Sequence, residues 1–152
     1  AAVREHGVAP PAPGRAVRAE GRWWCPIIPE RLLVLDFAPG HRALPSPTRV
    51  SSIDLSADYA TLLVLGPHAD RLLVDTGHAT GPVPVGAIRT RVGDPRATVV
   101  RVGATRYVVQ VPTARAGDLW RCLMTAGRPL HAAAVGRDAQ RLLAVADARE
   151  TR

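Results

Sequence analysis

The stretch YATLLVLGPHADRLLVDTG, residues 59–77, predicts the first half of the fold. Its apolar run from Thr61 to Leu65 has the length and composition of a buried strand. Gly66-Pro67 then marks a junction, because proline suits the first turn of a helix, where its missing N–H costs nothing. Gly77 suits the helix end. The helix between them would bury one stripe, formed by Ala69, Leu72, Leu73 and Thr76.

A second stretch, ATVVRVGATRYVVQVPTARAGDLWRCLMTAG at residues 97–127, predicts a hairpin followed by a helix. Two β-rich runs, 97–102 and 106–111, flank the three-residue loop Gly103-Ala104-Thr105. The helix is expected from about Ala114 to Ala126, with Gly127 as its stop. Its inward stripe is predicted to contain Ala116, Leu119, Trp120, Leu123 and Met124.

Between these two stretches, residues 85–92 alternate as a half-buried strand does. Ile88, Thr90 and Val92 fall on one face, with Arg89 and Arg91 on the other. Two arginines on one strand face would grip a carboxylate or a phosphate, although a plain solvent-facing side is the alternative. The order strand, helix, strand, hairpin and helix predicts an α+β fold of the ferredoxin-like, split βαβ kind, with both helices on one sheet face.

The N-terminal part differs in composition from the rest of the chain. Residues 1–21 are rich in Pro, Gly and Arg and are predicted to form an extended arm, with a single α+β domain over 22–152. In that domain, Leu32 to Leu35 is a short strand candidate, and Pro26 and Pro29 confine the preceding run to an edge or a bend. The tandem Trp23-Trp24 would stack a ligand ring or place one ring in the core and one at an interface. The tail contains a third helical pattern, in Ala139, Leu142, Leu143 and Ala146.

The charge balance favours an acidic partner. The formal net charge is +7, and all 20 basic residues are arginine. Such a chain is attracted to nucleic acid or to an acidic protein surface. The arginines are scattered singly, and a nucleic-acid binder would interleave them with exposed aromatic rings, for which only Tyr107 on the hairpin qualifies. We therefore expect no nucleic acid among the partners.

Motifs for catalysis, metals and membranes are absent from the sequence. The two cysteines, Cys25 and Cys122, lie far apart without zinc-ligand spacing, and no two histidines fall at i, i+4. Gly66-Pro67 lacks the glycines and the lysine of a phosphate loop. Asp54 has no titratable neighbour in sequence and suits a turn or cap. With no apolar run long enough for a membrane span and no signal-peptide core, we expect a cytoplasmic chain with no catalytic residue and no metal site.

Several segments together resemble the gamma subunit family of heterotetrameric sarcosine oxidase, within the folate-binding aminomethyltransferase-like superfamily. The similar segments are Ile53-Asp54-Leu55-Ser56, LLVLGPHADRLL (62–73), VGAIRTR (85–91) and RYVVQVPTARAGDLWRCLMTAG (106–127). Residues 11–15 and RWWCPIIPERLLVL (22–35) are similar to the family's opening, although 28–33 depart from its usual Gly-Pro-Asp/Glu pattern. The tail VGRDAQRLLAV (135–145) is similar to a helix of the aminomethyltransferases.

This resemblance implies a ferredoxin-like half packed beside a second small antiparallel sheet. It implies an accessory, non-catalytic chain in a flavin-dependent amine oxidase or demethylase, bound to larger flavoprotein subunits. FAD, FMN, NAD and tetrahydrofolate would be held by those partners, and none by this chain alone. As residues that contact the partner, we predict Trp23, Trp24, Arg89 and Arg91.

The alternative is a stand-alone, tetrahydrofolate-binding protein of the aminomethyltransferase kind. That family is more than twice as long, and its His-Met after Asp-x-Ser is replaced here by Ala57-Asp58. Folate needs a deep apolar slot with a carboxylate partner. An enzyme of this kind would show a pocket with convergent titratable groups, whereas an accessory subunit would show a large exposed apolar or arginine-rich patch.

Overall fold

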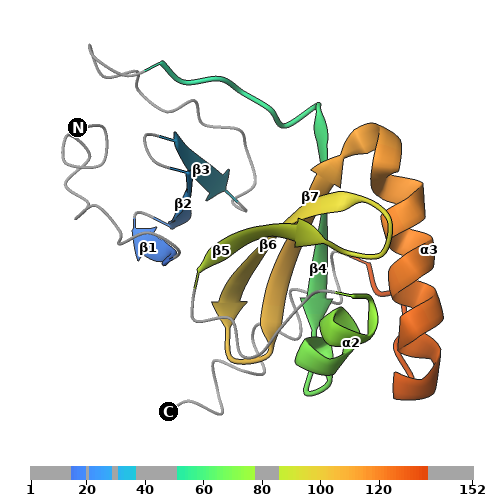
Figure 1. The fold of residues 1–152 in the computed structure, drawn as a ribbon. Helices are drawn as coiled ribbons and strands as arrows, with labels where there is room; N and C mark the ends of the chain where they lie inside the picture. Colours follow the sequence, from blue (N-terminus) through green and yellow to red (C-terminus); the bar gives the residue numbers. More distant parts are fainter. Residues whose placement is uncertain (1–14, 20, 29–30, 37–50, 78–85, 137–152) are drawn as a thin grey trace.

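Two antiparallel sheets and two α-helices make up the computed structural model (Figure 1). The structure describes residues 15–19, 21–28, 31–36, 51–77 and 86–136. Most of the predicted arm, and the third helical pattern beyond residue 136, lie outside the described residues. The α+β class and the second small antiparallel sheet are confirmed.

The larger sheet contains β4 (Tyr59–Leu65), β5 (Ala87–Arg91), β6 (Arg96–Gly103) and β7 (Arg106–Pro112), in the order β4-β7-β6-β5. The hairpin β6–β7 forms where the alternation and its loop predicted it. β6 and β7 are inserted between β4 and β5, the two strands that flank α2, whereas the two strands of a split βαβ unit run parallel. Two strands intervene and every pairing is antiparallel, so β4 and β5 run in opposite directions.

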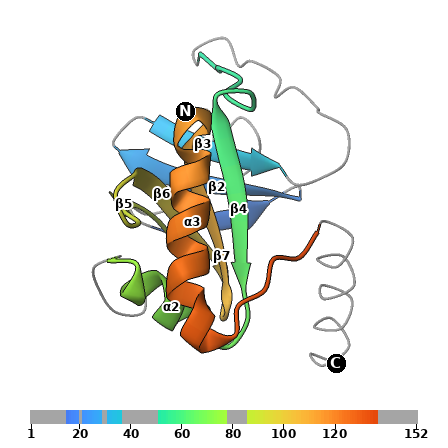
Figure 2. The ribbon, with the colours of Figure 1, turned by 90° about the vertical axis from the view of Figure 1, so that its right-hand side faces the viewer.

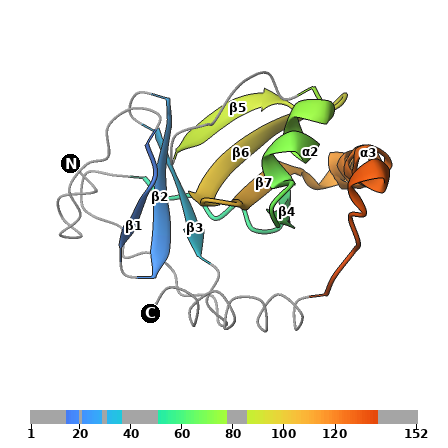
Figure 3. The ribbon, with the colours of Figure 1, turned by 90° about the horizontal axis from the view of Figure 1, so that it is seen from below.

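Both helices cover one face of this sheet, and the small sheet lies on the other face (Figures 2 and 3). The face under the helices is almost closed. It buries one apolar cluster that includes Val99, Val109, Val111 and Leu119, all at 0% exposure. Because side chains alternate along a strand, their neighbours Val100 and Val108 point the other way, into the contact with the small sheet.

Helix α2 (Ala69–Asp75) follows the predicted stripe. Ala69, Leu72 and Leu73 are buried, and Thr76 at its end is 5% exposed. The Thr76 hydroxyl donates to the carbonyl of Leu73 at 2.7 Å, which satisfies a polar group that would otherwise be buried without a partner. The end at Gly77 is also confirmed, since its φ of 82° is the left-handed conformation that favours glycine.

Helix α3 (Ala116–Gly127) begins after a 3₁₀ turn at Thr113–Arg115 and continues into another at Arg128–Leu130. Two details of its prediction were wrong. Gly127 does not stop the helix but is buried in its last turn. Trp120 is 45% exposed, because it lies at the edge of the stripe and the sheet-facing space is filled by Leu119 and Leu123.

The small sheet consists of β1 (Val17–Ala19), β2 (Arg22–Ile28) and β3 (Arg31–Asp36), in that order. Its first strand lies inside the predicted arm. The prolines and glycines that argued for an arm all precede residue 15, whereas 16–19 are free to pair. The run that contains Pro26 was predicted to be an edge strand or a bend, and β2, which contains it, is the central strand. The pairing of β2 with β3 shifts register between Pro26 and Ile28, so the bend is the alternative that occurs.

A second buried cluster joins the two sheets. It contains Cys25 and Leu35 from the small sheet, with Ala87, Val100 and Val108 from the larger one. Where β2 begins and β3 ends, the Nε of Arg22 pairs with the Asp36 carboxylate at 2.9 Å. The four-stranded sheet is therefore covered from both sides, by helices on one and by three short strands on the other.

Candidate partner interface

The tandem tryptophans are divided between the two faces of β2. Trp23 is half-buried against the cluster between the sheets. Trp24 points to the outer face of the small sheet, where it is 2% exposed and packs with Val17 and Val34. Successive residues on a strand point in opposite directions, so the two rings cannot hold one planar ligand together. Their predicted contact with a partner stays a prediction.

Arg89 and Arg91 are both exposed on β5 and lie on the same face of the strand. The pairing of β5 with β6 places Arg96, also exposed, directly opposite Arg91. We call these three residues the arginine edge. Within the described part of the chain, none of their guanidinium groups has an acceptor or an acidic partner. Like charges directly opposite on two strands are destabilising, so this arrangement does not serve the stability of the isolated chain.

Sequence reasoning found the first two members of the arginine edge and missed Arg96. The turn Gly93-Asp94-Pro95 could have revealed it, because a reversal centred there brings Arg91 opposite Arg96. Arg96 was placed just before the predicted strand rather than in it. The strand begins one residue earlier than the apolar run suggests, since register rather than apolarity decides where pairing starts.

A polar row crosses the sheet beside the arginine edge. The cross-strand pairings place Thr61 beside Gln110, Gln110 beside Thr98, and Thr98 beside Arg89. Thr61 and Arg89 are exposed, Gln110 is half-buried and Thr98 is 6% exposed. The next row along the same face is apolar and packs with the small sheet; it consists of Leu63, Val108, Val100 and Ala87. Polarity therefore changes within one face, from a covered apolar row to a polar row ending in arginine.

The segment 51–58, which leads into β4, is exposed along its whole length. It holds two large apolar side chains in water, Ile53 at 79% and Leu55 at 40% exposure. Its base is tied to the end of β7, where the N–H of Thr113 donates to the Asp58 carbonyl at 2.8 Å. Asp54 accepts from the N–H of Ser56 at 2.9 Å, so the turn role predicted for this carboxylate is confirmed.

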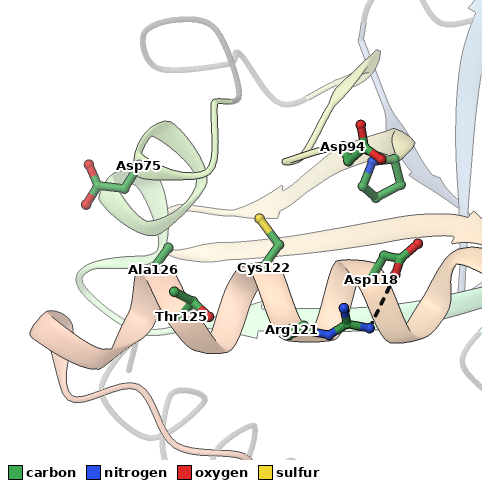
Figure 4. Close-up of a pocket in the computed structure, with 8 residues that line it drawn as sticks. Asp75, Asp94, Asp118, Arg121, Cys122, Thr125 and Ala126 are labelled. Atoms are coloured by element: carbon green, nitrogen blue, oxygen red, sulfur yellow. Dashed lines mark hydrogen bonds and ion pairs between the residues drawn. The ribbon is translucent and has the colours of Figure 1, made fainter.

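A pocket of about 570 Å³ lies on the helix side, between α2, α3 and the turn after β5 (Figure 4). Three carboxylates line it, but they do not converge: Asp75 and Asp94 lie at opposite ends of the pocket. Asp94 pairs with Arg115 at 2.9 Å, and Asp118 pairs with both Arg115 and Arg121. These carboxylates are neutralised by arginine and form a surface ion-pair network, not an acid–base pair.

Both thiols are held in their protonated forms. Burial raises the pKa of Cys25 to about 12, and burial also raises the pKa of Cys122. The thiolate is the reactive form of cysteine, so neither residue has the environment of a nucleophile. Cys122 lines the pocket, yet its sulfur packs so closely on Gly93 that a side chain at that glycine would collide with it.

Tyr107 is the polar link inside the helix-side core. Its hydroxyl donates to the Asp70 carboxylate at 2.5 Å, and the ring is 2% exposed. Burial, and then the hydrogen bond to Asp70, raise the pKa of Tyr107 to about 12. The Arg101 guanidinium lies 5.6 Å from the ring centroid. This tyrosine therefore packs in the core and is not available to stack a nucleobase.

The described residues contain no cluster of three or more histidine, cysteine or acidic side chains placed to bind a metal ion. Over the same residues, no helix combines the length and the apolarity needed to cross a bilayer.

Comparison with solved structures places the fold. The structure superposes on a chain of the heterotetrameric sarcosine oxidase from Corynebacterium sp. U-96, solved in complex with pyrrole 2-carboxylate. The superposition covers 89% of this chain and 75% of the sarcosine oxidase chain, with a TM-score of 0.66 and 19% sequence identity. The two chains share a fold. No protein-family profile matches the sequence, and no curated protein matches it. The likeness to the sarcosine oxidase chain therefore rests on three-dimensional arrangement rather than on sequence.

Proposed function

We propose that this chain is a non-catalytic accessory subunit, of the gamma type, in a heteromeric flavin-dependent amine oxidase or demethylase similar to sarcosine oxidase. The observation that carries the proposal is the superposition on one chain of a heterotetrameric sarcosine oxidase. The same aligned region is 89% of this chain and 75% of the other, so the matched chain is only about a fifth longer. The matched chain is therefore of small-subunit size, as an accessory role requires, and is not a large catalytic subunit.

The surface supports a partner. An accessory subunit should expose apolar or charged groups that its own fold leaves uncovered. The segment 51–58 exposes Ile53 and Leu55, and the arginine edge exposes three unmatched positive charges. In this proposal larger flavoprotein subunits cover these groups and hold the FAD, FMN, NAD and tetrahydrofolate of the complex.

The pocket between α2 and α3 is a poor fit for a folate. A pterin ring needs a deep apolar slot and a carboxylate free to bind it. In the pocket between α2 and α3, Asp94 and Asp118 are already paired with arginine. The Asp75 carboxylate oxygen lies 3.7 Å from the Nε of Arg71. The stand-alone, folate-binding alternative thus finds no support in this pocket.

The test is to purify the untagged chain from its own host and to record its native mass and its absorbance together. We expect it to elute with larger subunits in a yellow complex that oxidises a secondary or tertiary amine. A colourless monomer that binds tetrahydrofolate would overturn the proposal in favour of the stand-alone protein.

A further inference from the structure

The arginine edge is a part of the described surface whose positive charge its own fold does not neutralise. Its three guanidinium groups have no acceptor among the described residues, and Arg91 faces Arg96 across two paired strands. On the helix side the arrangement is the opposite: Arg71, Arg115 and Arg121 each pair with an aspartate. These three helix-side arginines are neutralised by the chain itself, whereas those of the arginine edge are not.

We infer that the arginine edge is a binding site for an acidic, extended segment of the partner subunit, with carboxylates two residues apart. This inference rests on the proposed function and names the chemistry of one of its contacts. Arg89 and Arg91 are two residues apart on a strand, which separates them by roughly 6.5 Å along it. A partner segment with acidic residues at i and i+2 repeats this distance, so each carboxylate meets one guanidinium. Arg96, across the pair, supplies donors to the second carboxylate.

The polar row extends the site across the sheet. Beyond Thr98, which is only 6% exposed, the half-buried Gln110 and the exposed Thr61 continue from Arg89 toward β4 with an amide and a hydroxyl, which donate to or accept from a peptide backbone. Beyond them, the exposed Ile53 and Leu55 offer apolar contact on the segment that leads into β4. This surface is positively charged at the arginine edge and apolar at Ile53 and Leu55, so it suits a protein segment that is acidic at one end and apolar at the other.

The same surface does not suit a nucleic acid. Single-stranded binders combine basic grooves with aromatic rings that stack on bases. Tyr107, the aromatic residue of the hairpin, is 2% exposed and lies on the helix-covered face of the sheet. Trp120, which is exposed, lies on α3 and so on the other side of the sheet from the arginine edge. Trp23 is half-buried against the apolar cluster between the sheets, so a carboxylate-bearing protein segment fits the arginine edge better than a nucleic acid.

Arg91→Glu separates binding from folding, because the two effects have opposite signs. In the isolated chain, the introduced carboxylate would face Arg96 and convert a repulsive cross-strand pair into an attractive one. The midpoint of urea unfolding should therefore stay the same or rise. In the complex the reversed charge would face the partner's carboxylates, and the dissociation constant should rise about 100-fold, since close charge pairs at interfaces couple strongly. Arg89→Glu should act in the same direction.

The matched control is Arg128→Glu, which reverses another exposed arginine at the end of α3, on the helix side. Its dissociation constant from the co-purified flavoprotein should change less than about 2-fold, since a charge outside the contact adds little to affinity. The wild-type affinity should fall as salt rises, and Arg91→Glu should flatten that dependence, because exposed charges are screened by ions.

Arginine footprinting checks the same site without a mutation. The chain has no lysine, so phenylglyoxal modifies its arginines without side reaction at lysine. In the complex, Arg89, Arg91 and Arg96 should be protected while Arg128 stays reactive. If wild-type chain and flavoprotein associate but Arg91→Glu binds as tightly and the arginine edge stays reactive, the inference fails and the proposed function stands. If the wild-type chain associates with no flavoprotein, the proposed function fails, and this inference with it.

Discussion

The two faces of the four-stranded sheet are built from the same strands and carry opposite chemistry. The face under the helices buries valines from β6 and β7 together with Leu119 of α3, at 0% exposure. The other face is apolar only where the small sheet covers it, and it then turns polar through Thr98 to Arg89. The first face uses all of its surface to hold the fold together. The second leaves a charged margin that contributes nothing to the stability of the isolated chain, and this difference locates a partner-facing surface.

The largest loss of stability is expected from removing a core side chain from the helix-covered face. Leu119→Ala removes a fully buried side chain and should lower the free energy of unfolding by about 3 kcal/mol, through lost burial and the cavity left behind. Urea unfolding followed by circular dichroism measures it. Trp120→Ala, one residue along but 45% exposed, is the control and should cost less than about 1 kcal/mol. Equal losses at both positions would mean that the helix is rotated from the packing described here.

A smaller effect is expected where the turn after β5 packs against α3. Gly93 has a φ of 64°, and a side chain added there meets the sulfur of Cys122. Gly93→Ala should therefore cost about 2 kcal/mol, from the backbone conformation and the collision together. Adding Cys122→Ala should restore the part due to the collision and leave the backbone part. Strictly additive losses in this double-mutant cycle would contradict the contact.

The hydrogen bond that joins α2 to the sheet should contribute about 1.5 kcal/mol, the lower end for a hydrogen bond to a charged group. Tyr107→Phe removes it and keeps the ring. The pKa of Tyr107 is raised from its ordinary 10.0 to about 12, so the folded state holds this proton more tightly than the unfolded state does. Its contribution is thus complete below about pH 10 and is lost as the pH rises toward about 12. Unfolding of both proteins at about pH 8 and about pH 11, on either side of the ordinary tyrosine pKa, measures the difference, which must shrink at the higher pH; a constant gap would refute the assignment.

The smallest effect is expected at Thr98 on β6, and its neighbour Val99, which faces the opposite way, is the comparison. Thr98, on the polar row, is 6% exposed, and Thr98→Val replaces its hydroxyl with a methyl group that is buried there, so the free energy of unfolding should rise by about 0.5 kcal/mol. Val99→Thr places a hydroxyl in the helix-covered core and should lower it by about 2 kcal/mol. The two changes in the free energy of unfolding have opposite signs because Thr98 and Val99 lie on opposite faces of the sheet. A loss at both positions would show that the polar row is needed for the fold itself.

Sequence reasoning was most successful where a pattern is local. The stripe of α2, the hairpin β6–β7 and the α+β class follow from spacing that any short window displays. It failed where a neighbouring element decides the outcome. Trp120 fits the apolar spacing of α3, yet Leu119 and Leu123 fill the available surface, so the larger ring is left in water. β2 contains a proline and is nevertheless central, because a register shift accommodates it.

The candidate surface could be foreseen only in part. Arg89 and Arg91 share a strand face by simple alternation, which a sequence reveals. Arg96 joins them only through cross-strand register, and the polar row exists only once β4, β6 and β7 are set side by side. The separation of the tryptophans needed both sheets, since which face of β2 is inward depends on what packs against it.

The sequence by itself determined the helices and strands of the larger sheet, and that the chain is strongly basic through arginine alone. Those properties depend on residues near one another in the chain. Only the tertiary structure decided the strand order, the two differently covered faces and the meeting of three arginines at one edge. The physical reason is that strand pairing and burial depend on residues that are distant in sequence. The charge of a surface patch or the polarity of a face exists only after folding has brought those residues together.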